Sequence, residues 1–169
     1  MKFSAYEEYG LRCLLQIGRQ GEGGSLTISD ISRAEGLSIS NVAKLTRILR
    51  RSGFLKSARG QAGGYTLSRS PDHIVVGEAL AVLGGRLFEP DFCDRHVGNE
   101  KVCTNSVDCS IRSLWRAVQL VVDQVLRKTT LQDLLRNEQE MATWAGNLVK
   151  LSDIRTQQPQ FRVETNEGV

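Results

Sequence analysis

The sequence has little of what an enzyme or an exported protein needs. Only 2 histidines occur in 169 residues, and there is no Gly-rich phosphate loop, no Ser/His/Asp constellation and no paired-carboxylate motif. An enzyme, and with it a small-molecule substrate, is therefore not expected. No run approaches the roughly 18 apolar residues that span a bilayer. The N-terminus places Glu7 and Glu8 where a signal peptide needs an apolar core, so we expect a cytoplasmic protein without a membrane partner.

The composition is that of an ordinary globular protein. Hydrophobic residues make up 40% of the chain and charged residues 24%, which excludes a wholly disordered chain, a collagen-like repeat and a coiled-coil rod. A length of 169 residues suits one domain, or one small domain with an accessory element.

Acidic residues are missing from the stretch between Ser38 and Ser70. Residues 33–69 hold eight Lys and Arg against the single acid Glu35, a net charge of +7 in a chain whose total is +3. Such a block is typical of a surface that docks a polyanion such as nucleic acid. An ordinary solvated basic surface is the alternative. The order of residues within the block distinguishes it from a docking surface.

Two helices separated by a short Gly-containing turn are predicted around this block, in the helix-turn-helix pattern. A capping box at Thr27 and Asp30 begins the first helix and Gly36 ends it, while the second runs from Ser38 to about Ser52. The inward face of the second helix is apolar, with Val42, Leu45 and Leu49. The opposite face offers small polar side chains for base edges and cations for phosphates, from Ser40, Lys44, Arg47 and Arg51.

A β-hairpin is predicted directly after the second helix. Residues 54–58 and 65–68 form its strands, and the loop between them holds three glycines and Arg59. As a wing, this loop lets the arginine enter a minor groove, where the negative potential is enhanced. A plain hairpin is the alternative. The wing interpretation adds three residues to the predicted DNA contacts: Lys56, Arg59 and Gln61.

Four cysteines occur, and in the cytoplasm they are expected to be reduced. Cys13 is isolated in an apolar run and is expected to pack in the core. Cys93, Cys103 and Cys109 are separated by nine and five residues, which is typical of a metal or redox site. Zinc held together with His96, an iron–sulfur cluster with a fourth ligand, and a disulfide switch all remain open on spacing alone.

A long helix is predicted over residues 111–126, with a continuous apolar stripe of heptad-like spacing. Helix-turn-helix readers usually act as symmetric dimers, so we interpret the stripe as a homodimer interface. Packing within one subunit is the alternative. Other helices are predicted over residues 3–19 and 74–83, and from Thr130 toward Leu148. The predicted interface residues are Ile111, Leu114, Trp115, Val118, Val122 and Val125.

The predicted organisation has four parts, and the fold class is mainly α with a small β-hairpin wing. Residues 1–85 are expected to form a winged helix-turn-helix DNA-binding domain, and residues 86–110 a cysteine-rich loop that would bind a metal or a cluster. Residues 111–150 form the dimerisation helices. Residues 151–169 have little apolar content and are expected to be a flexible tail.

In this order the motifs resemble the Rrf-two family of bacterial regulators, of the IscR, NsrR and RirA type. The wing sequence RGQAGGY at residues 59–65 is similar to the family's R-G-x-x-G-G-Y signature. The cysteine loop followed by Leu114-Trp115 and by Thr129-Thr130-Leu131 is also family-like, and the resemblance covers roughly residues 1–136. It implies a homodimeric winged-helix regulator of transcription, commonly a repressor. Its binding to promoter DNA would be controlled by an iron–sulfur cluster that senses redox state, nitric oxide or iron supply.

The resemblance also implies roles for individual residues. The ligands of the cluster would be Cys93, Cys103, Cys109 and, from the other subunit, Glu8. Glu7 is the neighbouring candidate for the acidic ligand. Arg59 matches the wing arginine that enters the minor groove. The recognition helix would begin with Ser38, Ser40, Asn41 and Lys44.

The chain departs from the family pattern in places that bear on its specificity. The gap between Cys93 and Cys103 is longer than usual, and Arg112 stands where IscR-like members have a histidine. Ala43 stands where they have an acid that contributes to sequence choice, so the DNA site is expected to differ. With Glu8 as fourth ligand, a 4Fe-4S cluster is slightly favoured over 2Fe-2S. A zinc- or thiol-switch regulator on the same fold is the alternative.

Overall fold

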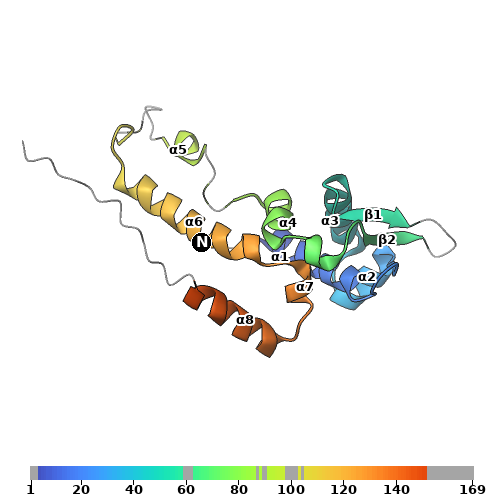
Figure 1. Cartoon of the computed structure of the whole chain (residues 1–169). Coiled ribbons are helices and arrows are strands. Elements are labelled where there is room, and N and C mark those ends of the chain that lie inside the picture. Colours follow the sequence, from blue (N-terminus) through green and yellow to red (C-terminus); the bar gives the residue numbers. More distant parts are fainter. Residues whose placement is uncertain are drawn as a thin grey trace, which may run out of the picture.

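The computed structural model describes residues 4–58, 63–86, 88, 91–97, 103 and 105–151. These residues are mostly helical, with a short antiparallel hairpin (Figure 1). In chain order the elements are α1 (Ala5–Gly18), α2 (Ile28–Glu35), α3 (Ile39–Arg51), β1 (Leu55–Ala58), β2 (Gly64–Leu67), η1 (Pro71–His73), α4 (Val76–Leu83), α5 (Phe92–Arg95), α6 (Ser110–Lys128), α7 (Leu131–Leu134) and α8 (Glu138–Leu151).

The helix-turn-helix is formed by α2 and α3. Thr27 Oγ1 accepts the backbone N–H of Asp30 at 3.1 Å, and the Asp30 carboxylate accepts that of Thr27 at 3.2 Å, which is the capping box. Gly36 ends α2 with a φ of 65°, a left-handed conformation that glycine adopts at little cost. Ser38 Oγ then accepts the Asn41 N–H and begins α3. Both predicted helices and the turn between them are confirmed.

The predicted hairpin is present as β1 and β2. They pair antiparallel, with Ala58 opposite Gly64, and Leu26 adds a further bridge to Tyr65. A Cβ atom on Gly64 would lie 2.5 Å from the Leu26 carbonyl oxygen, so this approach of two backbones requires glycine. The tip of the hairpin, residues 59–62, lies outside the described residues.

One hydrophobic core joins α1, α2, α3, the hairpin and α4. Val42, Leu45 and Leu49 are buried in it, which confirms the inward face of α3. Leu131 is also fully buried there, so the chain beyond α6 is anchored in the same core. The buried cluster consists of Cys13, Leu14, Ile17, Ile31, Val42, Leu45, Leu49, Phe54, Leu55, Ile74, Ala79, Leu83 and Leu131.

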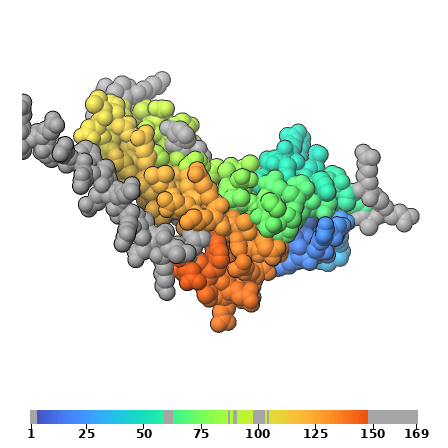
Figure 2. Space-filling model, viewed as in Figure 1, coloured from blue at the N-terminus to red at the C-terminus, as the bar shows by residue number. Residues whose placement is uncertain are grey.

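The 19-residue helix α6 extends away from this core (Figures 1 and 2). At 1.5 Å per residue it is about 28 Å long. It packs against α4, and α5 lies near its N-terminal end, where Cys93 and Asp94 share a hollow with Arg112 and Arg116. Helix α6 therefore connects the cysteine loop at one end to the winged-helix core at the other.

The segment after α6 differs from the prediction of one helix running from Thr130 toward Leu148. The structure has two helices, α7 and α8, because Asn137 interrupts the chain between them. The Asn137 side-chain oxygen accepts the N–H of Glu140 at 2.9 Å and so caps a new helix. The short helix α5 within the cysteine loop was not predicted either, since four residues are too few to show a period.

Candidate functional site

The polar face of α3 is exposed to solvent, as its spacing predicts. It carries cations and no acid, so its potential is positive and suits a phosphate backbone. The hydroxyls of Ser38 and Ser40 lie 3.1 Å apart at the start of the helix. The exposed predicted contacts on this helix are Ser38, Ser40, Asn41, Lys44, Arg47 and Arg51.

Lys44 is held against the first turn of α1. Its Nζ lies 4.7 Å from the centre of the Tyr6 ring, a cation–π contact that fixes the direction of the side chain. Tyr6 was not among the predicted site residues, because nothing in its local sequence indicates a contact with a helix some forty residues away. It ties the recognition helix to the segment that contains Glu7 and Glu8.

Hydrogen bonds between α1 and the end of α2 are a second feature that the sequence did not reveal. Arg12 Nε donates to the Glu35 carboxylate at 2.5 Å, and Arg12 Nη2 donates to the Glu35 carbonyl at 2.7 Å. The Gln16 side chain donates to the other carboxylate oxygen. The hydrogen bond with Glu35 raises the pKa of Arg12. Glu35, the single acid of the basic block, therefore holds α1 and the helix-turn-helix together.

The wing is described only in part. Lys56 is exposed on β1, where it stands opposite Thr66. Arg59 and Gln61 lie outside the described residues. Their contacts with DNA stay predictions.

The three clustered cysteines are free thiols and half-buried. Cys93 lies on α5, and Cys109 is the N-cap of α6, where its Sγ accepts the backbone N–H of Arg112 at 3.3 Å. Within the described ranges, no three of the His, Cys, Asp and Glu side chains are grouped closely enough to hold a metal ion. Much of the segment between Cys93 and Cys103 lies outside those ranges. The described residues bring Cys93 and Cys109 near the first turns of α6, and the assembly of the predicted ligands stays a prediction.

His96, the residue that a zinc site would use, packs against its own helix. Its ring stacks on Phe92 with centroids 4.0 Å apart, and its Nδ1 lies 2.7 Å from the Phe92 carbonyl oxygen. One ring nitrogen is therefore engaged, and Nε2 is the nitrogen that would reach a metal.

Cys13 is separate from this group. It is fully buried in the core, as predicted, and burial raises the pKa of its thiol to about 12. A thiol of that kind stays protonated near neutral pH and is a poor ligand or nucleophile. Cys13 therefore serves as an internal control for the other three cysteines.

The two candidate acids on α1 have different surroundings. Glu7 is buried, its carboxylate accepts the Ser4 N–H at 2.6 Å in a capping box, and its side chain packs against Gly84. Glu8 is exposed. The role of Glu8 as a ligand of the cluster stays a prediction.

The apolar stripe of α6 is only partly covered. Ile111, Leu114 and Trp115 are 58%, 56% and 40% exposed, and Val121 is 48% exposed. Three further residues of the stripe are half-buried: Val118, Val122 and Val125. Large apolar side chains in a row on one helix face indicate a protein–protein contact.

The C-terminal end of α6 is joined to the winged-helix core through backbone hydrogen bonds. Val76 N donates to the Thr129 carbonyl at 2.9 Å, and Leu131 N donates to the Ile74 carbonyl at 2.8 Å. A capping box of Thr130 and Asp133 then begins α7. We call this connection the joint, defined as residues 74–76 with 129–131. These hydrogen bonds link the end of α6 to the segment that follows the wing.

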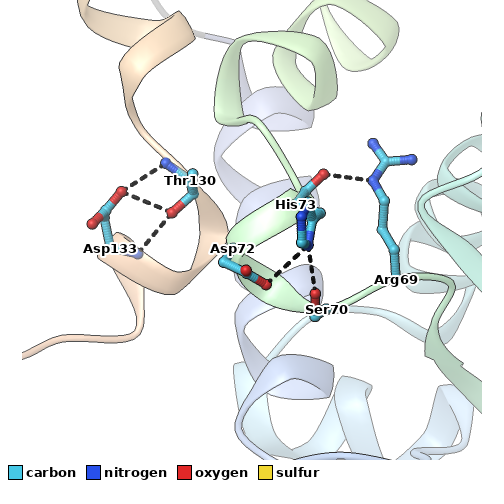
Figure 3. Close-up of polar contacts among 6 residues, drawn as sticks. All are labelled: Arg69, Ser70, Asp72, His73, Thr130 and Asp133. Carbon is cyan, nitrogen blue, oxygen red and sulfur yellow. Dashed lines mark hydrogen bonds and ion pairs between the residues drawn. The ribbon is translucent and has the colours of Figure 1, made fainter.

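Ser70, His73 and Asp72 come together beside the joint (Figure 3). Ser70 Oγ lies 2.8 Å and Asp72 Oδ1 3.3 Å from the same His73 nitrogen, Nδ1. A catalytic triad needs the hydroxyl and the carboxylate on opposite ring nitrogens, so these three residues do not form one. The hydrogen bond with Ser70 lowers the pKa of Asp72. The group shapes the turn at η1, whose His73 carbonyl also accepts from Arg69 at 2.7 Å.

Comparison with known proteins agrees with this geometry. Residues 3–137 match the family described as Rrf2, iron-dependent transcriptional regulator. Protein rrf2 of Nitratidesulfovibrio vulgaris is 31% identical over 137 residues, which are 81% of this chain and 89% of that protein. The structure of CymR, the global cysteine regulator of B. subtilis, is 30% identical with a TM-score of 0.65, over 80% of this chain and 96% of that one. IscR of T. potens is 30% identical with a TM-score of 0.63, over 80% and 86%.

The fold and the exposed basic helix define a winged-helix, DNA-binding regulator of transcription. The chain belongs to the Rrf2 family, the Rrf-two family that its motifs resemble. Its relatives are regulators and not enzymes, which confirms that prediction. In the part of the chain that the structure describes, no helix has the length and apolar character needed to cross a membrane.

Proposed function

We propose that the protein is a homodimeric cytoplasmic regulator, acting as a repressor, whose binding to promoter DNA is controlled by an iron–sulfur cluster. The cluster, 4Fe-4S rather than 2Fe-2S, is held by Cys93, Cys103 and Cys109, with Glu8 of the partner subunit as fourth ligand. It senses redox state, nitric oxide or iron supply. Two subunits associate through α6, and each presents α3 and its wing to the DNA.

One observation carries this proposal: the cysteines lie at one end of α6 and the joint lies at the other. Cys109 caps the helix, so a ligand bound to its sulfur is attached directly to α6. A 19-residue helix is stiff over its roughly 28 Å. The hydrogen bonds of the joint then link it to the segment after the wing. Ligand binding at the cysteines thereby biases the placement of the two DNA readers.

The donor chemistry fits an iron–sulfur cluster. Three free cysteines are half-buried, so their thiols remain accessible to an incoming iron–sulfur cluster. Arginines line the hollow beside Cys93, and cations favour a group that carries negative charge on its thiolate ligands. When bound, the cluster supplies a redox- and nitric oxide-sensitive centre, and the chain supplies the ligands and their transmission to α6.

Serine at any of the three positions removes a ligand, so C93S, C103S and C109S each lose most of their iron and sulfide. The matched control is C13S, which changes a buried thiol outside the site and keeps the wild-type content. Iron and acid-labile sulfide are counted per subunit after anaerobic purification. Equal losses in C13S and the other three variants would remove the assignment of ligands.

Glu8→Ala changes the cluster's visible absorption spectrum or its lifetime in air, because the fourth ligand is lost. The control is Glu22→Ala, which removes another exposed acid that lies outside the site. Spectra of both variants are compared with the wild type at equal iron content. An unchanged spectrum in Glu8→Ala would exclude Glu8 as a ligand.

Arg47→Ala weakens binding to a random-sequence duplex and reduces the slope of log K against log salt by about 0.9, since one phosphate contact is lost. Arg136→Ala, an exposed arginine on the other side of the joint, leaves the slope unchanged. Fluorescence anisotropy between about 50 and 200 mM salt measures both. A wild-type affinity that barely changes over this range would contradict the assigned DNA surface.

A zinc or thiol switch on the same fold is the second candidate. It is favoured by the three free cysteines and by the similarity to CymR, described as the global cysteine regulator of B. subtilis. Zinc binding would be colourless and would depend on His96 as well as the cysteines. His96→Ala therefore separates the two: it abolishes binding of zinc and leaves a cluster in place.

A further inference from the structure

A hollow of about 490 Å³ opens beside Cys93, and its charge is unbalanced. Its lining includes Arg112 and Arg116 from one face of α6, with Arg86 from the loop before it, against the single acid Asp94. Arg86 also pairs with Asp123. The two arginines of α6 are one helical turn apart, so both project toward the same side as Cys93. The surroundings of Cys93 are therefore cationic.

Arg112 connects two of the three cysteines. Its backbone N–H donates to Cys109 Sγ at 3.3 Å, while its side chain lines the hollow that contains Cys93. Its guanidinium also donates through both Nη atoms to the Ser106 carbonyl, each at 3.2 Å. These two bonds hold the loop between Cys103 and Cys109 against the first turn of α6. Arg112 thus donates to the sulfur of Cys109 and lines the same hollow as Cys93.

Arg112 cannot act as a metal ligand, because a guanidinium stays protonated and has no lone pair to donate. What it brings is positive charge and hydrogen-bond donors. A thiolate-ligated cluster gains a further negative charge on reduction, and nearby cations and N–H donors to sulfur favour that reduced form.

We propose that Arg112 and Arg116 form the cationic wall of the cluster site and raise the cluster's reduction potential, with Arg112 also positioning Cys109. This inference rests on the proposed function, because it assigns a regulatory property to the same site. It makes the two arginines determinants of which oxidants and reductants the regulator responds to.

The test uses the anaerobically purified full-length protein and spectroelectrochemical titration of its visible absorption. Arg112→Gln and Arg116→Gln each lower the midpoint potential. A unit charge roughly 10 Å away at an effective dielectric of about 20 shifts the ratio of reduced to oxidised cluster by about tenfold. For a one-electron couple this equals ~59 mV. Arg112→Lys, which keeps the charge, stays near the wild-type potential. The matched control is Arg127→Gln, an exposed arginine further along α6 that does not line this hollow.

The outcomes separate this inference from the proposed function. Cluster-loaded glutamine variants with an unchanged potential overturn the role of the arginines and leave the cluster sensor intact. Wild-type protein without iron and sulfide overturns both. Arg116→Gln serves as the second variant if Arg112→Gln fails to load its cluster, since the hydrogen bonds that hold the loop come from Arg112. If Arg127→Gln lowers the midpoint potential as much as the other two variants, the effect comes from the net charge of the protein, and the specific role of Arg112 and Arg116 is overturned.

Discussion

Replacing Leu114 and Val121 of α6 with glutamate converts the protein to monomers and weakens its binding to an operator by at least about 100-fold. The two side chains are 56% and 48% exposed on the apolar stripe, so the subunit loses little of its own packing. In a dimer the new carboxylates would be buried unpaired against the partner, which is costly. Loss of the second reader removes the avidity of two linked half-sites, which is worth 10²–10⁴ in affinity.

The measurement is molar mass by light scattering, followed by anisotropy on an operator that the wild-type protein has selected from a random pool. Gln124→Glu is the matched control, because it adds a carboxylate to an exposed position on the polar face of the same helix. It is expected to remain dimeric with wild-type affinity. A double variant that still dimerises would show that the subunits associate through another surface.

Leu131→Ala lowers the free energy of unfolding by about 2–5 kcal/mol, the usual cost of emptying a fully buried leucine site. Leu131 is a fully buried residue of the joint. Its side chain reaches toward Gly18 of α1, and its backbone N–H donates to the Ile74 carbonyl. The substitution leaves that hydrogen bond in place and removes the packing beneath it. The end of α6 is then held less firmly on the DNA-binding domain.

Urea unfolding at a fixed protein concentration measures this loss, since the stability of a dimer depends on concentration. Gln132→Ala is the control, because it changes an exposed neighbour on the same short helix and should stay within about 0.5 kcal/mol of the wild type. Similar midpoints for the two variants would show that α7 is not part of the core.

Local patterns predicted the DNA-reading fold well. The capping box at Thr27, the break at Gly36 and the apolar period of Val42, Leu45 and Leu49 each depend on neighbours within a turn or two. Such signals are visible in the sequence because the spacing alone produces the structure. The helix after Thr130 was less predictable, since Asn137 is compatible with either a helix interior or a cap.

The contacts between distant residues could not be predicted in the same way. Glu35 was counted as an exception in a basic block, although it braces Arg12 and Gln16 of α1. Tyr6 showed no sign of its contact with Lys44. Both depend on how α1 crosses the helix-turn-helix, which is set by the packed core and not by local spacing. The spacing of the cysteines also left open which group they bind, because it does not distinguish an iron–sulfur cluster from zinc or a disulfide.

The most direct test of the account is the visible absorption spectrum of the anaerobically purified protein, with iron and acid-labile sulfide counted per subunit. We expect a coloured protein that contains both elements, with a band shape typical of a 4Fe-4S cluster. A colourless protein that contains neither, even after anaerobic reconstitution, would contradict it and leave a zinc or thiol switch on the same DNA-binding fold.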